Sequence, residues 1–271
     1  MRGKLIVKVC GMRDAANIRE VDGLTSERNG SAKLLAPDWM GFIFWPESSR
    51  YVSEVPDCMP KHAKRVGVFV DEHIDEVIRI AKAFALDIIQ LHGHESPEYL
   101  RQLLSIGGSA TAIVKAFSIA TVADLEQTAG YEGLADYFLF DTKGKSVGGN
   151  GEQFDWSVLN AYKGRTPFLL SGGIGPDDAS RIRALFENTS YPSSVDASST
   201  SSVDASSPES VECSSSASVV GGFPADRCIG VDLNSRFETA PALKDVNKLK
   251  QFIEELEEKV KTIMTSETSK N

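Results

Sequence analysis

Short apolar stretches rich in β-branched and aromatic residues recur along this chain and alternate with segments of helical periodicity. Such alternation is typical of repeated strand–helix units, which assemble into a parallel sheet. There are eight apolar stretches, the number that closes a barrel, so the pattern predicts an α/β fold, a single-domain (β/α)8 TIM barrel. The predicted strands are Leu5–Val9, Trp39–Phe44, Arg65–Val70, Asp87–Leu91, Ala112–Ala116, Tyr137–Phe140, Pro167–Leu170 and Ile229–Asp232.

Helical segments are expected after seven of these strands. The second strand–helix unit is the weakest, because Val52–Lys64 contains Pro56 and Pro60 and leaves room for only a short helix. The predicted helices are Ala15–Val21, Ile74–Phe84, Pro97–Leu104, Val122–Gln127, Trp156–Ala161, Pro176–Leu185 and Asp245–Thr262.

Two insertions do not fit a compact barrel. Gly23–Asp38 is mostly polar, and Glu187–Gly222 is rich in serine and contains the sequence SSVDASS twice. Fourteen of the 29 residues 190–218 are serine, which leaves too few apolar groups to offset the entropy of ordering, and we expect disorder there. Residues 1–265 are expected to form the catalytic barrel, with insertions at 23–38 and 187–222 and a flexible tail at 266–271.

Composition narrows the classes of partner. The 29 Lys and Arg against 38 Asp and Glu give a formal net charge of −9, the wrong sign for binding a nucleic acid backbone. No apolar run approaches the ~18 residues of a membrane span, and the N-terminus lacks the pattern of a signal peptide. The four cysteines show no CxxC pair or zinc spacing, so we expect a reduced, cytoplasmic protein without a metal.

Reacting groups in a parallel barrel come from the carboxyl ends of strands and the loops that follow. The first strand ends VKVCGM, which places Lys8 and Cys10 on the same face of the strand. A thiol near a cation has a lowered pKa and can act as a base, although a lone cysteine is also a common inert core residue. Asp141 ends the sixth strand before a glycine-rich loop, where an aspartate can equally be a turn former.

The loops after the seventh and eighth strands could bind an anion. Gly172 and Gly173 precede a helix opened by proline, and backbone N–H groups of such a turn attract phosphate, which barrels commonly bind at this place. Asn234 and Ser235 could complete the cradle, since they follow the eighth strand. Asp232 could orient backbone or substrate hydroxyls, or cap a turn.

Three other side chains are candidates for contact with a substrate. Arg50 follows the second strand and could pair a carboxylate through two-pronged recognition, or remain a solvated surface arginine. Gln90 and His92 share the inward face at the end of the fourth strand, where a histidine held by core hydrogen bonds is the alternative. The remaining histidines show no metal spacing.

In order along the chain, the motifs VKVCGM, GFIF…SSRYV, VGVFVD, IIQLHG, FDTKGKSVGGNGEQFDW, FLLSGGI and GVDLNSRFE resemble the phosphoribosylanthranilate isomerase family. The resemblance covers nearly the whole chain apart from the two insertions and the last ten or so residues. It implies an enzyme of tryptophan biosynthesis that opens the ribose ring of N-(5-phosphoribosyl)anthranilate and moves a proton in an Amadori rearrangement, without a cofactor. The implied product is 1-(2-carboxyphenylamino)-1-deoxyribulose 5-phosphate.

The same resemblance implies roles for the matching residues. Asp141 would protonate the ring oxygen as general acid, Cys10 would remove the C2′ proton as general base, and Arg50 would hold the anthranilate carboxylate. The phosphate would be surrounded by Gly172, Gly173, Asn234 and Ser235. Further contacts with the phosphosugar substrate are predicted for Lys8, Gln90, His92 and Asp232.

The chain departs from the family pattern at two places. Ser49 replaces the proline of the usual Ser-Pro-Arg-Tyr, and Arg236 replaces the glycine that commonly follows Ser235, which affects the positioning of Arg50 and of the eighth loop.

Two rival functions are a histidine-pathway barrel isomerase, which has an aspartate where Cys10 stands, and a non-catalytic phosphosugar-binding barrel, which needs neither Cys10 nor Asp141. The oligomeric state is expected to be a monomer or a homodimer.

Overall fold

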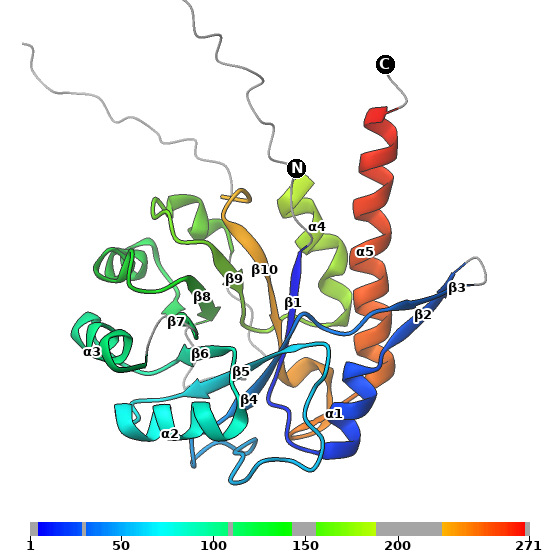
Figure 1. Cartoon of the computed structure of the whole chain (residues 1–271). Coiled ribbons are helices and arrows are strands. Elements are labelled where there is room, and N and C mark those ends of the chain that lie inside the picture. Colours follow the sequence, from blue (N-terminus) through cyan, green and yellow to red (C-terminus); the bar gives the residue numbers. More distant parts are fainter. Residues whose placement is uncertain (1–4, 29–30, 108–110, 143–155, 188–223, 269–271) are drawn as a thin grey trace, which may run out of the picture.

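The computed structural model describes residues 5–28, 31–107, 111–142, 156–187 and 224–268. Within them, parallel strands close into a barrel in the order β1-β10-β9-β8-β7-β6-β5-β4 (Figure 1). The predicted barrel is confirmed, and each predicted strand overlaps one of its eight strands. These strands are β1 (Ile6–Cys10), β4 (Trp39–Ile43), β5 (Lys64–Phe69), β6 (Ile88–Leu91), β7 (Ala112–Ile119), β8 (Tyr137–Thr142), β9 (Phe168–Leu170) and β10 (Cys228–Leu233).

Helices cover the outside of this barrel (Figure 1). The α-helices in the described residues are α1 (Ala15–Asp22), α2 (Ile74–Phe84), α3 (Pro97–Gly107), α4 (Ala179–Glu187) and α5 (Val246–Thr268). The helices predicted near residues 122 and 156 are instead 3-10 helices, η1 (Val122–Tyr131) and η2 (Trp156–Ala161), and two shorter ones are η3 (Pro176–Asp178) and η4 (Ser235–Phe237).

The second unit has no helix. The chain between β4 and β5 runs through turns and bends, so the short helix considered for Val52–Lys64 does not form. Two prolines explain this, because each removes a backbone donor and restricts the residue before it.

The helix α2 shows how the local sequence determines an element. Its buried residues Val77, Ile80 and Phe84 recur at helical spacing and face the barrel wall. Asp75 and Glu76 in the first turn complement the helix dipole, and Ala85 ends the helix in the left-handed conformation. Burying a side chain as large as Phe84 contributes about 2–3 kcal/mol, so this face holds the helix on the barrel.

The first insertion is ordered as a hairpin that the sequence did not predict. Within Gly23–Asp38, the antiparallel strands β2 (Thr25–Arg28) and β3 (Ser31–Leu34) lie beside α5 (Figure 1). Lys33 pairs with Glu257 of that helix. In the second insertion, Glu187–Gly222, residues 188–222 lie outside the described residues, as do residues 269–271 of the predicted tail.

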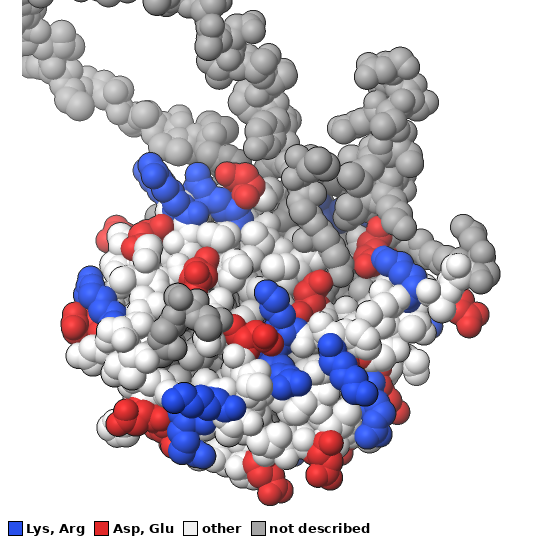
Figure 2. All heavy atoms as spheres, viewed as in Figure 1, with Lys and Arg blue, Asp and Glu red and all other residues white. Residues whose placement is uncertain are grey.

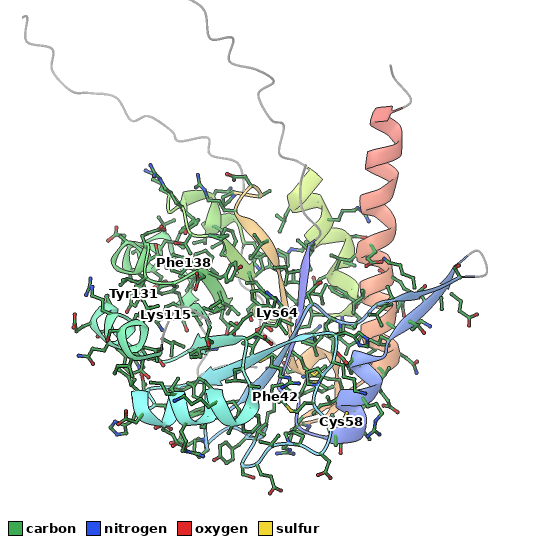
Figure 3. The ribbon with its side chains drawn as sticks, viewed as in Figure 1. Phe42, Cys58, Lys64, Lys115, Tyr131 and Phe138 are labelled. Carbon is green, nitrogen blue, oxygen red and sulfur yellow. The ribbon has the colours of Figure 1, made fainter. Side chains whose placement is uncertain are left out.

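The core has two layers separated by the barrel wall. One layer fills the barrel and contains Trp39, Val66, Ile88, Val114, Ala116, Leu139 and Leu169. The other is larger and lies between the strands and the helices. It is rich in aromatic contacts, and Phe138 meets Phe117 edge to face at a centroid distance of 5.1 Å, near Tyr131 (Figure 3).

Polar residues follow the inner apolar layer toward the carboxyl ends of the strands. Side chains two residues apart point to the same side of a strand. Asp141 therefore follows Leu139 on the inner face of β8, and Gln90 follows Ile88 on β6. The apolar layer fills the barrel, and the polar groups that could react lie beyond it, at the carboxyl ends of the strands.

The outer surface carries mixed charge. On the face seen in Figure 2, acidic and basic side chains are interspersed, and neither sign forms an extended patch. Across the described ranges, no helix is both long enough and apolar enough to cross a lipid bilayer.

Candidate active site

Cys10 and Asp141 lie at the same end of the barrel. Cys10 is the last residue of β1 and Asp141 the penultimate residue of β8, and all the barrel strands run parallel. Both side chains are largely buried, with 4% and 6% of their residue surfaces exposed. Asp232 lies on β10, the neighbour of β1 in the barrel, and its charge acts on Cys10. The charges of Asp141 and His92 act in turn on the carboxyl group of Asp232.

Lys8 is buried inside the barrel and paired with Asp232. Its Nζ donates to Asp232 Oδ1 at 2.9 Å, and a further side-chain hydrogen bond joins it to Cys10. Burial is the largest single influence and would lower the pKa of Lys8, but the charges of Asp232 and Cys10 and the hydrogen bonds to both together outweigh it, and the pKa lies above the ordinary value. Burial also raises the pKa of Asp232, against the attraction of Lys8, and the 2.9 Å contact is what favours the ionic pair. Asp232 thus has a charge partner that the sequence did not assign to it.

The expected lowering of the Cys10 pKa is wrong. Burial raises the pKa of this thiol, and the opposing attraction of Lys8 and Lys244 is smaller. The sequence places a cation beside the thiol but does not reveal the loss of solvent around it. Gly41 makes room for the sulfur, because a Cβ on that glycine would lie 2.8 Å from Cys10 Sγ.

His92 links Asp141 to the wall of the barrel. Its Nε2 lies 3.4 Å from Asp141 Oδ2, and its Nδ1 lies 3.0 Å from Gln90 Nε2. The Gln90 amide and one ring nitrogen of His92 therefore share a hydrogen bond, while the other ring nitrogen faces Asp141. Gln90 is fully buried, and its Oε1 has no hydrogen-bond partner among the described residues. Gln90 therefore orients His92 from within the barrel.

Arg50 lies in the loop after β4 and is held by a carboxylate from the far end of the chain. Its Nε and Nη2 donate to Glu238 at 2.8 and 2.6 Å. These hydrogen bonds raise the pKa of Arg50. Its backbone N–H also bonds Ser48 Oγ at 3.2 Å. Arg50 is thus ordered, and not the solvated surface arginine considered as an alternative.

The loops after β9 and β10 lie side by side. Gly172 and Gly173 have φ values of 87° and 65°, a left-handed backbone that favours glycine. In the next loop, Asn234 Oδ1 accepts from Lys244 at 2.9 Å, and Ser235 begins η4. Arg236 joins the two loops, because a Cβ on Gly175 would lie 3.2 Å from its Nε.

Sequence reasoning missed Glu238 and Lys244. Glu238 begins the short strand β11 (Glu238–Ala240), and Lys244 ends the short strand β12 (Leu243–Lys244). The two strands pair with each other, with Glu238 opposite Lys244. Glu238 is the last letter of the motif GVDLNSRFE, so a charged residue within reach of the eighth loop was visible. Nothing in the sequence marks Lys244 as buried.

A metal-binding arrangement is not seen in the part of the chain that the structure covers. No group of three or more His, Cys, Asp or Glu side chains there could hold a metal ion. The arrangement instead offers a carboxyl group, a thiol, an arginine and a pair of glycine and asparagine loops at one barrel end.

Comparisons with known proteins agree on one family. A family model described as N-(5'phosphoribosyl)anthranilate (PRA) isomerase matches residues 9–205. The curated N-(5'-phosphoribosyl)anthranilate isomerase of Phocaeicola vulgatus is 40% identical over 256 residues, which cover 94% of this chain and 100% of that protein.

Solved structures show the same barrel. Phosphoribosyl anthranilate isomerase from Thermotoga maritima is 25% identical with a TM-score of 0.65, over 93% of this chain and 98% of that one. A phosphoribosyl anthranilate isomerase in complex with reduced 1-(o-carboxyphenylamino)-1-deoxyribulose 5-phosphate is 23% identical with a TM-score of 0.62, over the same shares of the two chains.

Proposed function

The chain belongs to the N-(5'-phosphoribosyl)anthranilate isomerase family, and we propose that Cys10 and Asp141 perform its reaction as base and acid. The chain is an isomerase of tryptophan biosynthesis. It converts N-(5-phosphoribosyl)anthranilate into 1-(2-carboxyphenylamino)-1-deoxyribulose 5-phosphate. The observation that carries the proposed roles is the common location of the thiol and the carboxyl group at the carboxyl ends of β1 and β8.

Asp141 begins the reaction as general acid. It gives a proton to the ring oxygen of the ribose, the bond between that oxygen and C1′ breaks, and the nitrogen lone pair forms the C=N bond of a Schiff base. The Nε2 of His92, 3.4 Å from Asp141, fixes the carboxyl group in place. An acid on a rigid strand is held near its target without a cost in ordering at the moment of reaction.

Cys10 completes the reaction as general base. Its thiolate removes the proton at C2′, the electron pair of that C–H bond forms a C1′=C2′ double bond, and the C=N electrons return to the nitrogen. The resulting enolamine becomes the ketone when C1′ gains a proton and the hydroxyl at C2′ loses one. Lys8 and Lys244 stabilise the thiolate by their charge. A thiol and a carboxyl group in different surroundings can thus divide acid and base duties, as paired titratable groups in enzymes do.

Arg50 and the two last loops hold the substrate. The guanidinium binds the anthranilate carboxylate, while Gly172, Gly173, Asn234 and Ser235 surround the phosphate. Backbone N–H groups in a left-handed glycine turn before a helix are suited to an anion. The substrate is then fixed at both ends, with its sugar between Cys10 and Asp141.

The residues at the strand ends argue against the two rival functions. Cys10 stands where a histidine-pathway isomerase has an aspartate, and a barrel that only binds phosphosugars needs no acid and base. The absence of a cofactor, a location in the cytoplasm and a monomeric or homodimeric state remain predictions.

Replacing the acid and the base tests the proposal directly. We expect Asp141→Asn to lower kcat by about 10³-fold or more and Cys10→Ser by about 10²-fold, the range in which general acid–base groups contribute. The measurement follows the loss of substrate fluorescence, with thermal unfolding as the check on folding. Cys58→Ser is the matched control, because Cys58 lies between β4 and β5 and bonds only weakly to Met59 O at 3.9 Å. Unchanged activity in the double variant would discard the assignment.

A further inference from the structure

The Glu238 carboxylate is saturated with donors from three directions. Oε2 accepts from Arg50 Nη2 at 2.6 Å, while Oε1 accepts from Arg50 Nε at 2.8 Å, Lys244 Nζ at 2.7 Å and the Ala242 N–H at 3.2 Å. Only 6% of its side-chain surface is exposed. Although burial opposes ionisation, the hydrogen bonds from Arg50 and the charge of Lys244 keep the pKa of Glu238 below the ordinary value. Glu238 is therefore an anion fixed between two cations.

Lys244 is fixed at both of its ends. Its side chain has no exposed surface, and Nζ bonds Asn234 Oδ1 at 2.9 Å and Asn234 O at 3.3 Å in addition to Glu238. Its backbone is held by Asn17 of α1, which accepts from Lys244 N at 2.7 Å and donates to Lys244 O at 2.9 Å. The ammonium group therefore joins the loop after β10 to the Arg50–Glu238 pair.

Arg50 and Asn234 meet beside the residue that follows Cys10. A Cβ on Gly11 would lie 2.6 Å from Arg50 Cδ and 2.9 Å from Asn234 Oδ1, and Gly11 has a φ of 78°. Only glycine allows both side chains to approach this closely. The loops after β1, β4 and β10 thus converge on one point of the barrel mouth.

From these contacts we propose that Glu238 and Lys244 are positioning residues that present Arg50 to the carboxylate of the substrate. Glu238 occupies the Nε side of the guanidinium, which leaves Nη1 and the outer hydrogen of Nη2 as a planar pair of donors. Such a pair matches a carboxylate in two-pronged geometry. Lys244 sets the distance between this donor pair and Asn234 of the phosphate loop. The inference rests on the proposed function, in which Arg50 binds the anthranilate carboxylate.

The arrangement makes the two residues determinants of substrate class. A guanidinium that could rotate would bind a carboxylate in many orientations and would lose preorganisation. Held by Glu238, it selects substrates with an acidic group at the anthranilate position. Compounds with an unsubstituted aniline ring lack that group and gain nothing from the arrangement.

The first experiment compares two substrates in Glu238→Gln. We expect the KM for N-(5-phosphoribosyl)anthranilate to rise about tenfold, the effect of weakening one two-pronged contact, with kcat within about threefold. The KM for N-(5-phosphoribosyl)aniline, which lacks the carboxylate, is expected to stay within about twofold. Glu132→Gln is the matched control, because Glu132 also accepts several hydrogen bonds, from Thr166 and Arg165, away from the mouth.

The outcomes separate the inference from the proposed function. Equal changes in KM for both substrates, or no change for either, would overturn the positioning role. Arg50→Lys tests the underlying assignment, because loss of the planar donor pair affects the anthranilate substrate alone if Arg50 binds its carboxylate. A parent protein without isomerase activity, or an Arg50→Lys variant that treats both substrates like the parent, would reject the proposed function itself.

A second experiment measures the effect of the Lys244 charge on the titration of the Cys10 thiol. The charged groups that face Cys10 are Lys8, Asp232, Lys244 and Arg50, and Lys244 favours its thiolate. In a background with Cys58→Ser and C213S, we expect Lys244→Met to move the pH midpoint of Cys10 alkylation by iodoacetamide upward. An unchanged or lower midpoint would overturn the proximity of Lys244 to the site. If Lys244→Met does not fold, Lys244→Gln removes the same positive charge and carries the same expectation.

Discussion

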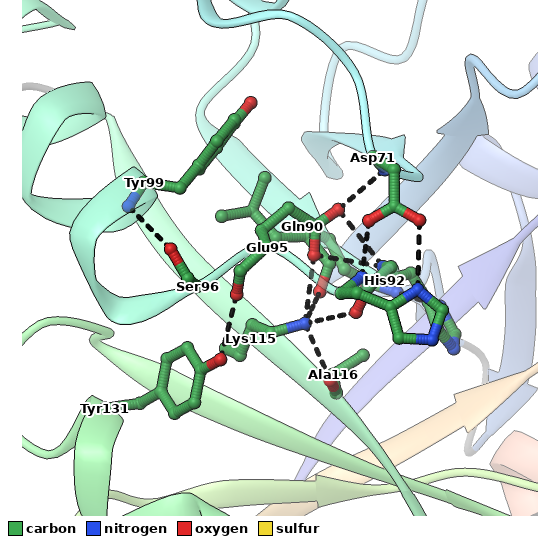
Figure 4. A network of polar contacts seen from close by, with 12 residues as sticks. Asp71, Gln90, His92, Glu95, Ser96, Tyr99, Lys115, Ala116 and Tyr131 are labelled. Carbon is green, nitrogen blue, oxygen red and sulfur yellow. Dashed lines mark hydrogen bonds and ion pairs between the residues drawn. The ribbon is translucent and has the colours of Figure 1, made fainter.

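Two clusters of buried lysine and carboxylate groups lie on opposite sides of the barrel wall. The mouth cluster consists of Lys8, Asp232, Arg50, Glu238 and Lys244. The wall cluster consists of Lys115 and Glu95, and it lies outside the barrel between β7 and the loop after β6 (Figure 4). Lys115 Nζ pairs with Glu95 Oε2 at 3.0 Å, and their side chains are only 3% and 1% exposed. By burial alone the two clusters look alike.

Their hydrogen-bond partners differ. Lys115 donates to the backbone carbonyls of Leu91, Gly93 and Ala116 at 3.3, 2.8 and 3.1 Å. Glu95 in turn accepts from the backbone N–H groups of Asp71 and Gly93. The wall cluster therefore ties loops together mainly through their main chain. The mouth cluster mainly pairs side chains, which come from β1, β10, the loop after β4 and the short strands β11 and β12.

The difference shows what a perturbed lysine does and does not indicate. Burial lowers the pKa of Lys115 and of Lys244, with a carboxylate opposing the shift in each case. A shifted pKa is often used to find active sites. Here the shift occurs in both clusters, and the type of partner separates them. The backbone bonds of the wall cluster mark a structural support for the loop that carries His92.

Removing the cation of the wall cluster has the largest expected effect on stability. We expect Lys115→Met to lower the free energy of unfolding by about 3–5 kcal/mol, because Glu95 is left buried and charged. The kcat of the folded protein is expected to stay within a few fold. Urea unfolding and the fluorescence assay check these two values, and the double variant with Glu95→Gln, which removes both charges, should recover part of the loss. A large fall in kcat without a loss of stability would assign the wall cluster to catalysis.

The pH dependence of Cys10 tests the charges of the mouth cluster that surround this thiol. Cys10 acts as a thiolate, and burial raises its pKa, so the thiolate fraction grows as pH rises toward that value. Because Asp141 must also carry its proton, kcat/KM does not follow the thiolate fraction alone, and alkylation of Cys10 by iodoacetamide is the direct measurement. We expect the alkylation rate to climb by about tenfold per pH unit until the thiol has titrated, above the ordinary thiol pKa. A midpoint at or below the ordinary thiol pKa would contradict the effect of burial on Cys10.

A smaller effect is expected at Arg236, which stands at the phosphate loops where the family pattern has glycine. Its guanidinium lies against Gly175, so Arg236→Gly removes a positive charge beside the predicted anion site. We expect KM to rise about two- to fivefold, and less at high salt, since exposed charges are screened. Arg101→Ala, at an exposed arginine of α3 that pairs with Glu98, serves as control. An unchanged KM at low salt would exclude Arg236 from the phosphate site.

The smallest effect is expected from the second insertion. It leaves the barrel after α4 and returns before β10, which is the end opposite to Cys10 and Asp141. We expect that deleting Glu187–Gly222 and joining the ends with a short linker keeps kcat within about threefold, as surface insertions are tolerated. The assay is the same, with thermal unfolding to confirm folding. A collapse of the rate in a folded variant would show that the segment reaches the mouth.

Local patterns were enough to predict the barrel. The helix Ile74–Phe84 has the predicted bounds, because its apolar residues recur at helical spacing beside acidic first-turn residues. The β2–β3 hairpin was missed, since its residues are mostly polar and give no alternation to recognise. The η1 segment was expected as an ordinary helix, although the hydrogen-bond pattern that makes it 3-10 is not visible in its composition.

The site residues also differ in whether a local sequence pattern reveals them. The common location of Cys10 and Asp141 could be predicted because strand ends of a parallel barrel share one edge, and their roles stay a prediction. Glu238 could not be assigned, because its partner Arg50 is 188 positions away and no local pattern encodes that contact. The Cys10 pKa was predicted in the wrong direction for a related reason, since solvent exclusion depends on every neighbour in space.

The pairing of Lys8 with Asp232 has a consequence for how the chain acquires its fold. These residues belong to the first and last strands of the barrel and are 224 positions apart. During synthesis, a ribosome-bound chain that has completed β1 to β9 would enclose an ammonium group with no counter-charge, at a cost of several kcal/mol. The final strand therefore brings in the neutralising group, and we expect truncated chains ending before β10 to stay unfolded and open to proteases.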